Sequence, residues 1–138
     1  IDFDNSFSER KYFYTDSGGD FIGDLCSGNM NHLFILPDEN VTICEQLYWN
    51  PDFILGNVKE NSITEIWNSQ KAIKLANLKP EHFKDDSACK QCCFFDKCHN
   101  TYKKCWLEII KAYGSSNWDY PDPRCKKAPP MKNKIFFD

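Results

Sequence analysis

Eight cysteines, seven of them in a spaced array, constrain this chain of 138 residues more than any other feature. Two residues separate Cys89 from Cys92, so a tight turn can aim both sulfurs at one point, and Cys98 follows after five more residues. Cys125 can join them only by a long return of the chain, and the two prolines shortly before it predict an extended approach. Thiolates grouped in this way normally hold metal. We therefore expect the function to depend on what the cysteines bind.

The other cysteines are more scattered. Four thiolates from the run and its returning arm would complete one metal site. A second site would have to combine Cys26 and Cys44 with Cys105, which leaves Cys93 over. The sequence therefore predicts one compact site and a second site assembled from distant segments.

Disulfides and zinc are the alternatives to an iron–sulfur site. An even number of cysteines fits disulfides, but eight in 138 residues is below the ~8–10% typical of disulfide scaffolds, and no signal segment is evident. Zinc is the stronger rival, because Cys-x2-Cys pairs are frequent in its sites and four thiolates suit its tetrahedral geometry. The spacing alone favours neither zinc nor iron–sulfur clusters.

Three separate segments resemble a SPASM domain, and they come in that family's order. They are Cys26-Ser-Gly-Asn to Val-Thr-Ile-Cys44, Phe53-Ile-Leu-Gly-Asn-Val to Ile-Trp-Asn-Ser69, and the cysteine run with its arm Pro121-Asp-Pro-Arg-Cys125. In radical SAM enzymes, among them peptide maturases and anaerobic sulfatase-maturing enzymes, the SPASM domain is the C-terminal part that carries auxiliary clusters. The resemblance covers roughly residues 24 to 125.

The resemblance implies two four-iron four-sulfur clusters instead of zinc. The second auxiliary cluster would be held by Cys89, Cys92, Cys98 and Cys125. The first would take Cys26, Cys44 and a third cysteine, at a position that Tyr102 occupies here. The family pattern therefore fails at one ligand.

Cys105 offers a replacement for that missing ligand. We predict a helix from residue 100 to residue 113 with Cys105 on its apolar face, which also carries Trp106, Ile109, Ile110 and Tyr113. Residues three apart on a helix are neighbours, so Cys105 could take the place of Tyr102. The alternative is that Cys105 packs as a small buried hydrophobe. The fourth ligand of the first cluster stays open, with Asp20, Asp24 and Cys93 as candidates.

The predicted fold is a small cysteine-rich α+β domain, with a β-hairpin, two or three helices and long loops around the clusters. Residues 33–36 and 41–44 should form the hairpin. Glu39 stands where the family usually has glycine, so we expect Asn40 to take the left-handed backbone conformation instead.

One longer helix is predicted from Ser62 to about Asn77. Ser62 and Glu65 fit a capping box, in which each side chain satisfies a free amide at the helix start. The expected apolar face consists of Ile63, Ile66, Trp67, Ile73 and Ala76, and Trp67 is predicted to lie in the core.

Charge is unevenly placed along the chain, which carries a net charge of −3. Residues 89–127 hold eight lysines and arginines against four acids, a net charge of +4. Cations near an anionic cluster favour its reduced form and raise its potential. The overall charge and the lack of a basic stripe argue against nucleic-acid binding, and no stretch is long and apolar enough for a membrane span.

A radical SAM core needs a cysteine triad spaced by three and then two residues. Here Cys89-x3-Cys93 is followed at the required position by Asp96, so this chain alone should be inactive and S-adenosylmethionine should bind only in a separate barrel domain. The expected organisation is a linker or remnant of a preceding domain in 1–25, the SPASM-like domain in 24–125 and a tail in 126–138.

The resemblance predicts the auxiliary-cluster domain of a radical SAM enzyme that modifies a peptide or protein. Its role would be electron transfer and substrate positioning, with the barrel domain and the peptide or protein substrate as partners. Oxygen-sensitive clusters imply a cytoplasmic setting. The alternative is a non-catalytic scaffold or protein-interaction module of the same fold that binds zinc.

Overall fold

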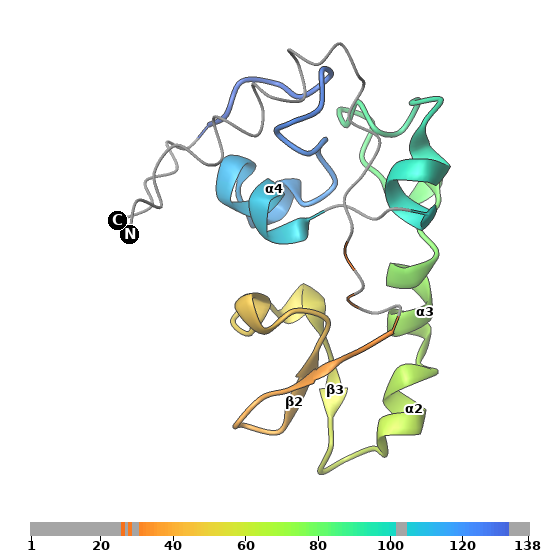
Figure 1. Ribbon diagram of the computed structural model, residues 1–138, viewed down its shortest axis with the longest axis vertical. Coiled ribbons are helices and arrows are strands. Elements are labelled where there is room, and N and C mark those ends of the chain that lie inside the picture. Colours follow the sequence, from red (N-terminus) through yellow and green to blue (C-terminus); the bar gives the residue numbers. More distant parts are fainter. Residues whose placement is uncertain (1–25, 27, 29–30, 102–104, 133–138) are drawn as a thin grey trace. The chain divides into compact units, whose positions relative to one another are not determined.

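The computed structural model describes residues 26, 28, 31–101 and 105–132 (Figure 1). The described residues form two compact units, which are considered separately. Residues 26–78 make up the first unit, and residues from Lys79 onwards belong to the second. Among the described residues, the first unit contains an antiparallel sheet and two α-helices, and the second contains one α-helix, several single helical turns and long loops. The predicted α+β class is confirmed.

The sheet of the first unit has three antiparallel strands in the order β1-β2-β3 (Figure 1). They are β1 (Phe34–Ile35), β2 (Asn40–Thr42) and β3 (Ile54–Asn57). Val41 in the central strand pairs with Ile35 on one side and with Gly56 on the other. The predicted hairpin is confirmed, whereas the third strand was not predicted.

In the hairpin turn, a different residue from the predicted one adopts the left-handed backbone conformation. Glu39 N donates to Leu36 O at 2.8 Å, and Leu36 N donates to Asn40 O at 2.8 Å. This three-residue loop needs a left-handed residue in its last position, and Glu39 takes it with φ 67°. The prediction for Asn40 was wrong, because Asn40 already belongs to β2.

The predicted single helix is two short helices. α2 (Ile63–Trp67) ends at its C-cap Asn68, and α3 (Gln70–Ala76) begins immediately afterwards. The hydroxyl of Ser69 accepts a hydrogen bond from Ala72 N at 3.2 Å and so caps a new helix start. The prediction of one continuous helix was therefore wrong, because Ser69 lies between two segments with helically spaced apolar residues and caps the start of a second helix.

The predicted capping box at the start of α2 is confirmed. Ser62 Oγ accepts from Glu65 N at 3.2 Å, and a Glu65 carboxylate oxygen accepts from Ser62 N at 3.3 Å. The helix is thereby held with Ile66 against β3. A Cβ atom on Gly56 would lie 3.0 Å from the Cγ1 of Ile66, so the glycine permits this close packing.

The predicted apolar face of these helices is only partly buried. Ile66 is buried, and so is Ala72, which was not in the prediction. Trp67 is 36% exposed and Ile73 is 50% exposed, so the assignment of Trp67 to the core was wrong. Because α2 has only five residues, a single side chain, Ile66, reaches the sheet and its neighbours stay at the surface.

The helix of the second unit, α4 (Trp106–Tyr113), starts later than predicted. A π-helical turn at Lys97–Thr101 precedes it, and residues 102–104, including Tyr102, lie outside the described residues. Cys105 is the N-cap of α4 in extended backbone, so the prediction that it lies within the helix was wrong. The buried face of α4 consists of Ile109, Ile110, Ala112 and Tyr113. None of the described helices has the length and apolar character needed to cross a bilayer.

Candidate metal centre

Four predicted ligands line one cavity of about 100 Å³ in the second unit. They are Cys89, Cys92, Cys98 and Cys125, and all four are partly buried. Much of the remaining wall is apolar and comes from Ala88, Phe94, Phe95 and Pro121. The cavity wall is therefore rich in thiols and apolar side chains, and it also includes His99 and Asp122.

Consecutive turns bring three of these cysteines to the cavity. Cys92 N donates to Cys89 O at 3.1 Å, and Phe95 N donates to Cys92 O at 3.1 Å. Cys98 N then donates to Phe94 O at 3.0 Å. Because each turn is closed by a backbone hydrogen bond, the run folds locally, with Cys89 and Cys92 in turns and Cys98 in the π-helical turn Lys97–Thr101.

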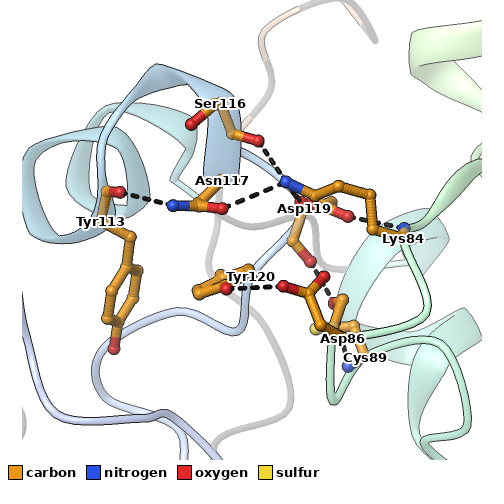
Figure 2. Close-up of polar contacts among 9 residues, drawn as sticks. Lys84, Asp86, Cys89, Tyr113, Ser116, Asn117, Asp119 and Tyr120 are labelled. Carbon is orange, nitrogen blue, oxygen red and sulfur yellow. Dashed lines mark hydrogen bonds and ion pairs between the residues drawn. The ribbon is translucent and has the colours of Figure 1, made fainter.

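Asp119 links the start of the run to the segment that leads to Cys125 (Figure 2). Its buried carboxylate accepts from Lys84 N at 2.7 Å and forms an ion pair with Lys84 Nζ at 3.2 Å. The carbonyl oxygen of Asp119 accepts from Ser87 Oγ, which itself accepts from Cys89 N at 3.3 Å. These contacts fix the backbone of Cys89 relative to residue 119.

Further contacts reinforce the same link. The ammonium of Lys84 donates to Ser116 O and to Asn117 Oδ1, and Tyr120 OH donates to Asp86 Oδ2 at 2.9 Å (Figure 2). The hydrogen bond to Asp86 raises the pKa of Tyr120. Segments that lie more than thirty positions apart in the sequence are thus joined beside the cavity.

Cys125 is placed by a folded turn. Its backbone N donates to Asp122 O at 2.8 Å, so the extended approach predicted for the arm was wrong at its last residues. The carboxylate of Asp122 accepts from Arg124 Nε at 2.9 Å and from Arg124 Nη2 at 2.8 Å. The guanidinium also lies 3.0 Å from Glu108 Oε2, which joins the arm to α4. A buried ion pair therefore shapes the Pro-Asp-Pro-Arg-Cys motif.

The electrostatics of the cavity centre on Cys125. Burial raises the pKa of its thiol, and the backbone N–H of Lys127 partly offsets this effect. The negative charge of Cys92 raises the pKa of the Lys127 ammonium. Because metal ligands must be thiolates, a bound cation would favour the deprotonated form that burial opposes.

The arrangement of the four cysteines can be compared with the needs of zinc and of a cluster. Within the described part of the chain, no three histidine, cysteine or acidic side chains come close enough to hold a single metal ion. A tetrahedral zinc with Zn–S bonds of ~2.3 Å would hold its thiolates only about 3.8 Å apart. In a cubic cluster the four thiolates bind different iron atoms and lie farther apart. The four thiols that line the cavity are the ligand type that iron–sulfur clusters use.

The first predicted site is divided between the two units. Cys26 and Cys44 belong to the first unit, and Cys105 belongs to the second. A Cβ atom on Gly28 would lie 2.6 Å from Ile43 O and 3.6 Å from Cys26 Sγ, so Cys26 lies near the chain that leads into Cys44. The participation of Cys105 stays a prediction.

Comparison with protein families identifies the segment that contains these cysteines. Residues 26–93 match the sequence model of the SPASM family, described as an iron-sulfur cluster-binding domain. Residues 26–93 are a SPASM domain. Domains of this family bind iron–sulfur clusters and are typical of radical SAM enzymes, which implies association with a radical SAM domain. Comparisons with curated proteins and with solved structures gave no match.

The SPASM match ends at Cys93, which is exposed and is not among the residues that line the cavity. Cys98 and Cys125 lie beyond the matched segment but line the same cavity as Cys89 and Cys92. The set of cysteines that line the cavity therefore extends past the segment that matches the SPASM family.

Sequence reasoning missed several residues that shape this site. The buried ring of His99 lines the cavity and lies 4.4 Å from the ring of Phe95. Asp119 was not assigned any role at the site, and Lys127 was considered only as one of the eight basic residues between positions 89 and 127. The sequence signal that would single out Lys127 from that group is its position two residues after a predicted ligand.

Proposed function

We propose that this chain is the auxiliary-cluster part of a radical SAM enzyme that modifies a peptide or protein, and that it binds two four-iron four-sulfur clusters. One observation supports the proposal most directly: four cysteines from the run and from its distant arm line a single apolar cavity. The SPASM match supports iron–sulfur binding and a radical SAM partner.

The proposed ligands follow the sequence prediction. The second cluster would be held by Cys89, Cys92, Cys98 and Cys125, and the first by Cys26, Cys44 and Cys105. We extend the proposed domain to residues 24–125, because the cavity needs cysteines beyond the family match. Residues 1–25 would be a linker and residues 126–138 a tail.

When bound, the clusters would supply one-electron chemistry, taking up or relaying the electron left on a substrate radical. The chain's own residues provide the setting for this chemistry. Phe94 and Phe95 exclude water from the cavity wall, which lowers the local dielectric around the thiolates. Asp119 and Asp122 hold the two backbone segments that present Cys89 and Cys125. The site would thus be preorganised for electron transfer.

Serine substitution of single cysteines tests the proposed ligands. In protein reconstituted anaerobically, Cys89→Ser and Cys125→Ser should each lose about four iron and four sulfide per chain, because a cluster with an incomplete thiolate set is lost. Cys93→Ser is the matched control, since Cys93 adjoins a proposed ligand but does not line the cavity. Full iron in Cys89→Ser and Cys125→Ser, or loss in Cys93→Ser of the same cluster signal that Cys89→Ser loses, would refute the assignment.

A further inference from the structure

Lys127 contacts two of the four cavity cysteines. Its backbone N donates to Cys125 Sγ at 3.4 Å, and its Nζ donates to Cys92 Sγ at 3.5 Å. Cys92 belongs to the cysteine run and Cys125 to the returning arm. Lys127 therefore donates hydrogen bonds to two cavity sulfurs, one from the cysteine run and one from the returning arm.

We propose that Lys127 is a positioning residue for the second auxiliary cluster, whose reduction potential it raises by donating hydrogen bonds to the sulfurs of Cys92 and Cys125. The inference rests on the proposed function, because it needs a cluster bound to these cysteines. It adds a residue outside the thiol set to the site.

The physical basis is the charge that the cluster gains. A one-electron reduction adds one negative charge to a cluster that its thiolates already make anionic. A hydrogen bond to a ligand sulfur withdraws electron density, and an ammonium beside that sulfur attracts the added charge. Both effects stabilise the reduced form more than the oxidised form, so both raise the potential.

Two other cations beside the ligands in sequence, Lys90 and Arg124, are paired with carboxylates. Lys90 follows Cys89 in the sequence, but its ammonium donates to the carboxylate of Asp85. Arg124 precedes Cys125, and its guanidinium is held by Asp122. The ammonium of Lys127 donates to a ligand sulfur instead, so this contact makes Lys127 a candidate for setting the potential.

The test compares midpoint potentials in the full chain after anaerobic reconstitution. Dithionite supplies the electrons, and the visible spectrum and the electron paramagnetic resonance signal report the reduced fraction. The signal that disappears in Cys89→Ser identifies the second cluster. Lys127→Met keeps the length of the side chain but removes its charge and its donor, Lys127→Arg keeps both, and Lys90→Met is the matched control for loss of one charge.

In Lys127→Met we expect about tenfold less reduced second cluster at a fixed solution potential, which corresponds to ~59 mV for one electron. Lys127→Arg and Lys90→Met should stay near the wild type. If Lys127→Met loses its iron while Lys127→Arg keeps it, the sulfur contact is also supported. An unchanged midpoint in Lys127→Met, an equal shift in Lys90→Met, or loss of iron in both Lys127 variants would overturn the inference. Absence of any cluster from the wild type would instead refute the proposed function.

Discussion

Glu39 holds a backbone conformation that costs free energy for any residue with a Cβ atom. A left-handed residue costs about 1–2 kcal/mol unless it is glycine. The side chain of Glu39 forms an ion pair with Lys59 at 2.8 Å, but both side chains are exposed and such pairs contribute little. The turn therefore retains strain at the position where the family usually has glycine.

Glu39→Gly should raise the free energy of unfolding by up to about 1 kcal/mol, because relief of the left-handed strain exceeds the entropy that glycine adds to the unfolded chain. Chemical denaturation of the two proteins measures the difference. Asn40→Gly is the control, since Asn40 is in β2 and glycine should destabilise it. A loss of stability in Glu39→Gly would show that the turn is not strained.

Tyr113 makes the free energy of unfolding depend on pH in the alkaline range. Burial raises its pKa to about 12, and the charge of Asp122 acts in the same direction. Its hydroxyl donates to Pro129 O at 2.8 Å and so joins α4 to the end of the described chain. Because the pKa of Tyr113 is higher in the folded than in the unfolded state, its contribution is complete below about pH 10 and falls as the pH rises towards 12.

Tyr113→Phe should therefore lower stability at neutral pH by about 1 kcal/mol through loss of the hydrogen bond, and it should weaken the fall in stability above about pH 10. Thermal unfolding followed across that range measures both effects. Tyr48→Phe is the control, because Tyr48 is exposed. An alkaline fall as steep in Tyr113→Phe as in the wild type would contradict the assignment.

At the scale of elements, α2 depends on a glycine in the neighbouring strand. The Cγ1 and Cδ1 atoms of Ile66 would lie 3.0 and 3.3 Å from a Cβ atom on Gly56. Gly56→Ala should lower the free energy of unfolding by about 1–3 kcal/mol, because α2 has to move outward or Ile66 has to leave its rotamer. In an Ile66→Ala background the same substitution should cost much less. Equal costs in the two backgrounds would exclude this contact as the cause.

Local sequence signals predicted some elements and missed others. The hairpin and the capping box at Ser62 depend on residues close in the chain, and both are confirmed. The break at Ser69 was missed because apolar residues recur with helical spacing on both sides of it. β3 was missed because its pairing with β2 depends on contacts between distant residues, which periodicity does not reveal.

The candidate site shows the same division between local and distant signals. The cysteine run was predictable from its spacing, and the structure gathers its cysteines with Cys125 at one cavity. Asp119 was not predictable, because its partner Lys84 lies 35 positions away. The contact from Lys127 to Cys92 spans the same distance in sequence. Spacing patterns therefore indicated the ligands but not the residues that hold or tune them.

At the scale of the whole molecule, the second unit has little regular structure around its cavity. α4 supplies a small core of Ile109, Ala112 and Tyr113 with Tyr120 and Met131 packed against it. Three of the cavity cysteines lie in turns and loops and Cys98 lies in a short π-helical turn, and ordering such backbone is costly in entropy. A bound cluster would join the run to the arm through covalent bonds to sulfur, so binding and folding of this unit should be coupled.

The central claim is that the chain binds two iron–sulfur clusters, and metal analysis tests it most directly. Iron, acid-labile sulfide and zinc are measured together with a visible spectrum on protein reconstituted under anaerobic conditions. The account predicts about eight iron and eight sulfide per chain with visible absorption. About four of each would limit binding to the site of Cys89, Cys92, Cys98 and Cys125. Zinc without sulfide in protein purified from cells would contradict the account.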